Sequence, residues 1–338
     1  MKVNNKVDAV IGLDLGDEGK GKITQALLQQ RNYDVCARFN GGPNAGHTIY
    51  LPSGEKQVNH QLPMSAGLSE VSSYIGPGCV LDWGALEDEI SKIPQSLDNL
   101  YISPRVPLIS KINKKQDDYK GSTKKGIAPA YGDFYARKSQ LAGDLSLIHQ
   151  GRELVQDIEE CENLLLEGAQ AFYLDPHWGN YPWTSSSIVS PAVASATFGF
   201  NPKKFDKIYG VAKAYRTAVG NHPDFFKDKN NKYEDVYNAI QHVGSEFGAT
   251  TGRRRHVQFL DLDALIFSIN QTSTSHLILN KCDVLQEVNE FHYWFNGDLC
   301  TFNTFEDMQL EMYELLFDYC DDLKLMQCFF SKYPEEVL

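Results

Sequence analysis

The stretch that most constrains this chain is an apolar strand that runs straight into a glycine-rich loop and then a helix. The run Ala9–Leu15 has the composition of a parallel strand buried on both faces, and Lys22–Gln29 continues with helical character. Glycines lie between them at positions 16, 19 and 21. Glycine lets the backbone approach a ligand closely, and the first turn of a helix presents N–H groups and the positive end of its dipole. The stretch therefore predicts a phosphate-binding loop.

This loop differs from an ordinary P-loop in two ways. The spacing from Gly16 to Lys22 nearly satisfies the P-loop pattern, but Ile23 stands where a serine or threonine would hold magnesium. Asp17 and Glu18 also place two carboxylates beside the expected phosphate, which they repel unless a metal intervenes or one of them acts as a base. The alternative is a plain strand–turn–helix junction with charged turn residues.

Strand and helix patterns alternate along the rest of the chain, which favours an α/β fold. They predict a mostly parallel central sheet flanked by helices, with ligands bound at the carboxyl ends of the strands. We expect one domain over residues 1–338, with mobile loops near residues 40–48, 111–126 and 248–256. An ordinary solvated loop is the alternative for 111–126. Residues 151–163 have the apolar spacing of an amphipathic helix.

The composition argues against several classes of protein. Asp and Glu number 44 against 32 Lys and Arg, a formal charge of −12, which disfavours a protein that coats nucleic acid but leaves a local nucleotide site open. No apolar run has the length of a membrane span, and no charged and apolar leader opens the chain. The seven cysteines are scattered and odd in number, so we expect reduced thiols in the cytoplasm.

Three further segments carry side chains suited to nucleotide chemistry. Residues 280–283, Asn-Lys-Cys-Asp, follow a predicted strand, and the aspartate can accept the N1–H and 2-amino N–H of guanine, a donor pair that adenine lacks. Residues 250–255, Thr-Thr-Gly-Arg-Arg-Arg, suit a carboxylate or phosphate, a basic surface patch being the alternative. His47 ends a loop rich in Gly and Asn, where a donor to a phosphoryl oxygen is favoured over a structural histidine.

Taken in order, these motifs resemble those of the adenylosuccinate synthetase family over nearly the whole chain. The matching segments are Gly16–Lys22, Asn44–Thr48, Gly126–Tyr131, Glu167–Gln170, Gly179–Pro182, Lys213–Tyr215, Gly248–Arg255, and Lys281 with Asp283. The resemblance implies a C–N bond-forming ligase in which GTP phosphorylates the C6 oxygen of a purine monophosphate and the amine of L-aspartate displaces that phosphate. It also implies magnesium as cofactor and a homodimer. Asp283 is the reason to expect GTP rather than ATP.

The resemblance further implies roles for individual residues. Asp17 would remove the N1 proton and ligate magnesium with the Gly46 carbonyl, while His47 and Lys20 would assist phosphoryl transfer. The GTP site would comprise Gly16, Glu18, Gly19, Lys20, Gly21, Lys22, Thr48, Lys281 and Asp283. The acceptor nucleotide would be bound by Asn44, Thr123, Arg137, Gln170, Ser185 and Val219, with Arg137 reaching the neighbouring subunit. L-Aspartate would be bound by Thr251, Arg253 and Arg255.

Four differences from the family pattern concern the acceptor half of the site. Lys124–Lys125 replaces a Gly-Arg pair, Trp183–Thr184 replaces Tyr-Val, Ala218 replaces an arginine, and residues 221–224 replace Gly-Pro-Phe-Pro. The chain also has the length of the archaeal members and of a phage branch that uses dGMP to make the precursor of 2,6-diaminopurine for phage DNA. We therefore expect dGMP as acceptor, giving N6-succino-2-amino-2′-deoxyadenylate, in the host cytoplasm if the gene is carried by a phage.

Two alternatives stay open from the sequence. Asp17 is the family's base, whereas phage relatives have serine there, so an ordinary enzyme that uses IMP in AMP biosynthesis is the main alternative. A non-catalytic guanine-nucleotide switch would share the phosphate loop and the 280–283 segment. Such a switch needs neither the arginines at 253–255 nor a base at Asp17.

Overall fold

The centre of the molecule is an eight-stranded sheet that is parallel throughout. The computed structural model describes residues 1–50, 56–118, 122–219, 232–248, 252–320 and 324–325. The strand order is β16–β13–β10–β1–β9–β2–β5–β6, so β1 lies between β9 and β10. The strands are β1 (Lys2–Gly12), β2 (Val35–Arg38), β5 (Ser72–Ile75), β6 (Leu100–Ile102), β9 (Glu160–Glu167), β10 (Phe205–Lys213), β13 (His276–Asn280) and β16 (Lys324–Leu325).

Smaller sheets and helices surround this core. A four-stranded sheet contains β11 (Tyr215–Val219), β12 (Arg255–Asp261), β14 (Phe291–Phe295) and β15 (Asp298–Phe302). Two hairpins are formed by β3 (His47–Tyr50) with β4 (Lys56–Asn59) and by β7 (Ile148–His149) with β8 (Arg152–Glu153). The helices are α1 (Lys20–Gln30), α2 (Trp83–Ile90), α3 (Lys111–Gln116), α4 (Ile127–Tyr135), α5 (Ala192–Phe198), α6 (Glu234–Val243), α7 (Leu262–Thr272), α8 (Cys282–Val288) and α9 (Phe305–Tyr319).

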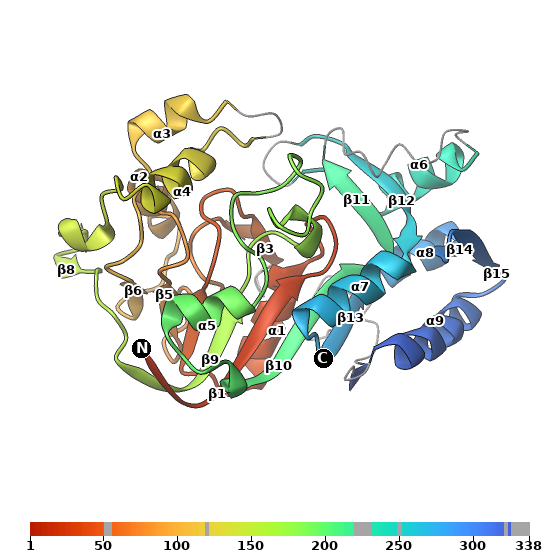
Figure 1. Ribbon diagram of the computed structural model, residues 1–338, viewed down its shortest axis with the longest axis horizontal. Helices are drawn as coiled ribbons and strands as arrows, with labels where there is room; N and C mark the ends of the chain where they lie inside the picture. Colours follow the sequence, from red (N-terminus) through yellow and green to blue (C-terminus); the bar gives the residue numbers. More distant parts are fainter. Residues whose placement is uncertain (51–55, 119–121, 220–231, 249–251, 321–323, 326–338) are drawn as a thin grey trace.

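The central strand β1 is buried on both faces because helices cover both sides of the sheet. Ala9 and Ile11 belong to an apolar cluster that includes residues of α5 and α7, which Figure 1 shows on the near side of the sheet. Val10 points the other way and joins a cluster that includes residues of α1. Alternation of side chains along the strand makes this two-sided packing possible. The position of β1 at the middle of the sheet follows from its continuous apolar run.

The predicted α/β fold, with a mostly parallel sheet flanked by helices, is confirmed, but the predicted helix over residues 151–163 is wrong. The chain there forms β8, an extended connection and the start of β9. The amide of Ile102 donates to the Leu154 carbonyl (2.9 Å), and the amide of Gln156 donates to the Ile102 carbonyl (3.0 Å). Pairing with a distant strand therefore overrides the helical spacing of the apolar residues.

The segment 111–126 begins with structure that its polar composition does not suggest. Residues Lys111–Gln116 form α3, whose first turn is closed by reciprocal hydrogen bonds between Ser110 and Asn113. After the helix, the buried carboxylate of Asp117 accepts hydrogen bonds from the Ser122 hydroxyl and the Gly126 amide. Movement of this segment on ligand binding stays a prediction.

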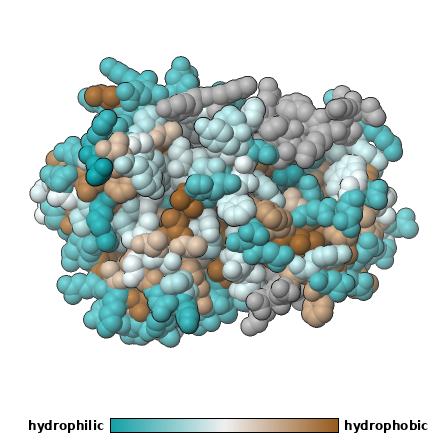
Figure 2. All heavy atoms as spheres, in the orientation of Figure 1, coloured by the Kyte–Doolittle hydropathy of each residue, from teal (hydrophilic) through white to brown (hydrophobic). Residues whose placement is uncertain are grey.

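The lengths of the helices and the face shown in Figure 2 describe the outside of the molecule. None of the helices described is both long and apolar enough to cross a bilayer. On the face shown in Figure 2, apolar residues form small groups scattered among hydrophilic ones. The composition of this face is ordinary for a water-exposed surface.

The buried carboxyl group of Asp8 on β1 should make the stability of the fold depend on pH. Burial raises its pKa above 3.8 despite a hydrogen bond from Tyr33. Because the folded-state pKa exceeds the unfolded one, the stabilising contribution of this group is complete below the unfolded pKa and is lost as the pH rises through the folded pKa. Thermal unfolding should therefore show Asp8→Asn gaining stability relative to the wild type as the pH rises from about 4, the ordinary pKa of an aspartate, toward neutrality.

Asp298→Asn, which changes an exposed carboxylate at the start of β15, is the control for the loss of one negative charge. A stability difference between Asp8→Asn and the wild type that stays constant over this pH range would contradict the assignment of the pH dependence to Asp8.

Candidate nucleotide-binding and catalytic site

The candidate site lies at the carboxyl edge of the sheet, where loops from several strands are tied together by side-chain hydrogen bonds. Asn40, after β2, accepts a hydrogen bond from the Ala169 amide (2.7 Å) and donates to the Ala169 carbonyl (3.2 Å), which joins it to the loop after β9. Asn280, at the end of β13, donates to the Glu18 carbonyl in the loop after β1 (2.6 Å). The sheet thus brings segments more than 100 residues apart in sequence to one place.

The loop after β1, Gly16–Lys22, has the backbone expected of a phosphate-binding loop and is called the cradle below. The side chain of Glu18 occupies its interior. Gly16, Asp17 and Gly19 all have positive φ angles, of 100°, 60° and 94°. The Gly16 amide donates to one carboxylate oxygen of Glu18 (2.7 Å), and the Lys20 ammonium contacts the other (2.8 Å). Both side chains are buried. Glu18 therefore acts as an internal anion that fixes Lys20 at the first turn of α1.

His47 is held by a buried carboxylate that was not assigned a role from the sequence. Its Nδ1 contacts Glu167 at the end of β9. Glu167 also accepts a hydrogen bond from the Met64 amide (2.8 Å) and faces the Arg38 guanidinium (3.6 Å). Burial lowers the pKa of His47, so the imidazole is neutral near pH 7. Burial opposes ionisation of Glu167, but His47 and Arg38 hold its pKa below the usual range, so His47 donates from Nδ1 to a carboxylate.

Arg255, which begins β12, joins the phosphate cradle to the arginine-rich segment. One end of its guanidinium contacts the Asp17 carboxylate (2.8 Å) and the other contacts Glu246 (2.6 Å). Asp17 is partly exposed, whereas Glu246 is buried. The structure therefore places the predicted base and one predicted aspartate ligand in direct contact, which the sequence did not indicate.

The predicted guanine-reading residues follow β13. Lys281 has a φ angle of 66° and donates from Nζ to the Gly244 carbonyl (2.9 Å), just after α6. Asp283 is exposed in the first turn of α8. The Asp283 carboxylate is therefore exposed one helical turn after the end of β13, where a purine base could reach it.

Residues predicted to bind the acceptor nucleotide lie on several elements. Asn44 adjoins Pro43, whose carbonyl accepts a hydrogen bond from Lys125 (2.6 Å). This bond joins the segment that contains Thr123 to the loop after β2. Gln170 follows the Asn40-bound Ala169 and has a φ angle of 67°. The Ser185 amide donates to the Leu174 carbonyl (2.7 Å).

The other two predicted acceptor ligands are exposed. Arg137 follows α4 with a φ angle of 61°, and Val219 ends β11 opposite Arg255. The predicted contact of Arg137 with a second subunit stays a prediction. Of the remaining predicted ligands, Arg253 is exposed beside Gly252, and Thr251 lies outside the described residues.

The neighbourhood of Ala218 is apolar, and a guanidinium lies nearby on the same strand. Ala218 is buried with Leu15 and packs near Leu174. Two residues earlier, Arg216 contacts Asp14 through its Nε (2.9 Å) and Nη2 (2.8 Å). Side chains two residues apart on a strand share a face. Position 218 therefore lacks the family's arginine, while the buried Arg216 pairs with Asp14 in the segment between β1 and the cradle.

The donor groups suit a magnesium ion that shares its ligands with a nucleotide. The described residues contain no cluster of three or more His, Cys, Asp or Glu side chains able to hold a metal by themselves. Magnesium is commonly bound through one or two protein oxygens together with substrate phosphates and water. The partly exposed Asp17 carboxylate and the carbonyl of the exposed Gly46 are donors of this kind.

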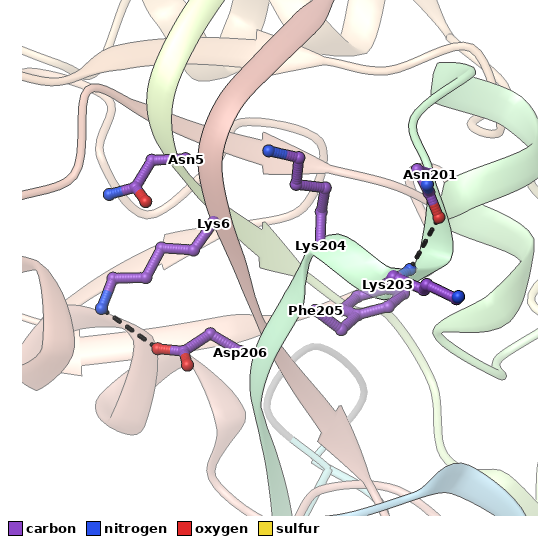
Figure 3. Close-up of a pocket in the computed structure, with 7 residues that line it drawn as sticks. All are labelled: Asn5, Lys6, Asn201, Lys203, Lys204, Phe205 and Asp206. Carbon is purple, nitrogen blue, oxygen red and sulfur yellow. Dashed lines mark hydrogen bonds and ion pairs between the residues drawn. The ribbon is translucent and has the colours of Figure 1, made fainter.

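A surface hollow of about 420 Å³ lies elsewhere (Figure 3). It is lined by Asn5, Lys6, Asn201, Lys203, Lys204, Phe205 and Asp206, and Lys6 there contacts Asp206 (3.1 Å). Phe205 is the first residue of β10, so this hollow is at the amino edge of the sheet. It is separate from the candidate site at the carboxyl edge.

Sequence comparison identifies a family that matches most of the chain. A sequence-family model described as adenylosuccinate synthetase matches residues 9–157 and 146–315. The adenylosuccinate synthetase of Cytophaga hutchinsonii is 34% identical over 359 residues, covering 87% of this chain and 82% of that protein. The enzyme of Thermoplasma volcanium is 33% identical over 341 residues, covering 83% and 76%.

Two solved structures share the fold. Fully ligated adenylosuccinate synthetase from Plasmodium falciparum superimposes with a TM-score of 0.84 and 24% identity, over 98% of this chain and 99% of that one. The succinoaminodeoxyadenylate synthetase PurZ of cyanophage S-2L, bound to dGMP and to dATP as an energy donor, gives a TM-score of 0.71 and 20% identity, over 93% and 100%. At these identities the likeness establishes the fold.

Gly12, at the end of β1, should be essential to the internal ion pair of the cradle. A Cβ atom there would lie 2.6 Å from a Glu18 carboxylate oxygen and 2.9 Å from the Lys20 ammonium. We expect Gly12→Ala to displace this pair, to lower the free energy of unfolding by about 1–3 kcal/mol and to weaken nucleoside triphosphate binding. Chemical denaturation and titration calorimetry would measure the two effects.

Gly132→Ala in α4 is a matched control, because a Cβ there meets nothing within 4 Å. Alanine in a helix should stabilise it by about 0.5–1 kcal/mol relative to glycine. Equal effects of the two substitutions would show that crowding of the ion pair is not the cause.

Proposed function

Because the chain belongs to the adenylosuccinate synthetase family, we propose that it is a GTP-dependent ligase that joins L-aspartate to carbon 6 of dGMP. Family membership makes the protein a C–N bond-forming ligase of the adenylosuccinate synthetase type. The non-catalytic switch considered from the sequence is thereby set aside. The product with dGMP is N6-succino-2-amino-2′-deoxyadenylate, the precursor of 2,6-diaminopurine in phage DNA.

The reaction divides into two steps that suit the arrangement of side chains. In the first, Asp17 takes the proton from N1, and the C6 oxygen attacks the γ-phosphorus of GTP with GDP leaving. In the second, the amine of L-aspartate attacks carbon 6, phosphate leaves with the C6 oxygen, and the amine loses a proton. Magnesium, held by Asp17 and the Gly46 carbonyl, would neutralise phosphate charge. His47 lies one residue from Gly46 and is oriented by Glu167 toward the same loop.

Binding roles follow the positions of the loops. The cradle from Gly16 to Lys22, including Gly19, Gly21 and the buried Glu18–Lys20 pair, receives the GTP phosphates with Thr48. Lys281 and Asp283 read the guanine. The acceptor lies among Asn44, Thr123, Gln170, Ser185 and Val219, with Arg137 contributed by the second subunit of a homodimer. L-Aspartate is bound by Thr251, Arg253 and Arg255. The loops near residues 40–48, 111–126 and 248–256 close over the bound ligands. The reaction takes place in the cytoplasm.

The environment of Ala218 is the observation that carries the choice of dGMP. In the family pattern an arginine precedes Val219, whereas here a buried alanine packs with Leu15, and the nearby Arg216 is already bound to Asp14. The polar contact that a family arginine would offer to the acceptor is therefore absent from this face of β11. A deoxyribose has one hydroxyl fewer than a ribose. Its binding is therefore weakened less by apolar surroundings, which leave a buried hydroxyl without a hydrogen-bond partner. The shared fold with PurZ, which is bound to dGMP, is compatible with this choice.

IMP is the second candidate acceptor because Asp17 is retained. Relatives about one-third identical to this chain are adenylosuccinate synthetases, and the base that the family uses on IMP is present here.

The phosphate donor is a separate question, since PurZ of cyanophage S-2L is bound to dATP as an energy donor. Asp283 favours GTP here, because its carboxylate matches the two N–H donors of guanine.

A steady-state assay with GTP, L-aspartate and either dGMP or IMP tests the proposal. We expect turnover with dGMP and a product whose mass corresponds to the succino-2-amino-deoxynucleotide. ATP in place of GTP is the control for the donor. Turnover with IMP and none with dGMP would leave the family assignment intact and refute the proposed acceptor.

Asp17→Asn should separate binding from chemistry. The amide cannot accept the N1 proton, and loss of a general base costs roughly 10²–10⁴-fold in rate. We expect no detectable 6-phosphoryl nucleotide by phosphorus NMR, while titration calorimetry still shows GTP binding. If the variant keeps wild-type activity, Asp17 is not the base.

A further inference from the structure

Glu246 is a buried carboxylate to which neither the motifs nor the proposed reaction gives a role. It lies in the connection between α6 and β12 and is 1% exposed. Its carboxylate accepts hydrogen bonds from Tyr215 (2.8 Å) and Arg255 (2.6 Å) and contacts the Lys213 ammonium (3.3 Å). Burial opposes its ionisation, but Lys213 and Arg255 lower its pKa to about 2, so it is a carboxylate at neutral pH.

Glu246 and Arg255 face each other at the base of a hairpin. The Arg255 amide donates to the Glu246 carbonyl (3.0 Å), and the Gly248 amide donates to the Arg253 carbonyl (2.8 Å). Between them, Phe247 and Arg254 form an antiparallel bridge. The proposed aspartate ligand Arg253 belongs to the same hairpin. The Glu246–Arg255 ion pair therefore closes the hairpin at the end nearest the sheet.

The same ion pair is part of a row of alternating charges that reaches the proposed base. The order is Asp17, Arg255, Glu246 and Lys213, with contacts of 2.8, 2.6 and 3.3 Å between successive groups. Lys213, at the end of β10, is itself buried and also bonds Thr217. Removing one member of such a buried row leaves its neighbour's charge uncompensated. The position of the Arg255 guanidinium is consequently determined from both sides.

The connection that carries Glu246 is also tied to the guanine-reading segment. Lys281 donates to the Gly244 carbonyl, two residues before Glu246. In addition, the side-chain amide of Gln241 donates from Nε2 to the backbone carbonyl of Glu246 (3.0 Å). The backbone around Glu246 is thus fixed by contacts independent of its carboxylate, so a change of the carboxylate alone acts mainly on Arg255 and Lys213.

We infer that Glu246 is a positioning residue that holds the Arg255 guanidinium where it can bind the carboxylate of L-aspartate without being wholly captured by Asp17. With Glu246 neutral, Asp17 is the one carboxylate left against Arg255 among the residues that the structure describes, and the guanidinium is drawn to it. The substrate must then compete with Asp17 for the same donors. This inference rests on the proposed role of Arg255 in aspartate binding.

Steady-state kinetics of Glu246→Gln test the inference. A hydrogen bond to a charged group contributes about 1.5–3 kcal/mol, so we expect the KM for L-aspartate to rise by about tenfold or more. The KM for GTP should change by less than the KM for L-aspartate, because Glu246 reaches the cradle only indirectly, through the contact of Arg255 with Asp17. Glu246→Asp keeps the charge and moves it back by one methylene group, so its KM for aspartate should fall between those of the wild type and Glu246→Gln.

Glu89→Gln is the matched control. Glu89 is another buried carboxylate, and it accepts hydrogen bonds from the backbone amides of His60, Gln61 and Leu62. Its loss should lower the melting temperature without changing the ratio of the two KM values. If Glu246→Gln does not fold, as judged by circular dichroism, Glu246→Asp supplies the kinetic test.

The outcomes distinguish this inference from the proposed function. Parallel increases in both KM values, or an aspartate KM unchanged in both Glu246 variants, overturn the positioning role while wild-type turnover still depends on aspartate. Wild-type turnover that is independent of L-aspartate overturns the proposed function itself. A selective increase in the aspartate KM, graded from Glu246→Asp to Glu246→Gln, supports the positioning role.

Discussion

The pairing of β1 with β9 and β10 on its two sides is the constraint on which the site depends. All of these strands are parallel, so their carboxyl ends lie at one edge of the sheet. The loop after β1 is thereby flanked by Glu167, which ends β9, and by Lys213, which ends β10. A register shift of one residue in β1 would exchange the side chains on its two buried faces and move the cradle relative to both residues.

Several of the charged groups at this edge are buried, and their mutual pairing specifies the geometry of the site. Glu18 is paired with Lys20, Glu167 with Arg38 and His47, and Glu246 with Lys213 and Arg255. An unpaired buried charge costs several kcal/mol, whereas a pair with satisfied hydrogen bonds is tolerated. Lys20 and Arg255, which are proposed to meet a phosphate and a substrate carboxylate, are therefore already held by protein carboxylates. At these two cations, binding of the proposed ligands would exchange one anionic partner for another.

The α/β fold, with its mostly parallel sheet flanked by helices, was predicted correctly because strand and helix patterns alternate along the chain. The glycines at 16 and 19 adopt positive φ angles because the strand–loop–helix turn requires them, and their spacing is visible in the sequence. The helix expected at 151–163 failed because Leu154 pairs with β6, a contact that no local pattern reveals. Glu246 was missed for a similar reason, since its partner Lys213 is 33 residues away. Glu167 lay within a recognised motif, and a charged residue directly after a buried apolar run could have drawn attention to it.

The proposed base and the proposed acceptor region belong to different structural elements, so they can change independently. Asp17 lies in the loop after β1 and is held by Arg255, whereas Ala218 lies on β11 among apolar side chains. Deprotonation at N1 is required for either IMP or dGMP, because both carry an oxygen at C6 and a proton at N1. The identity of the base therefore constrains the acceptor less than the surface around the sugar and the 2-position does. The Asp14–Arg216 pair joins the segment after β1 to β11, so the change at 218 leaves this connection in place.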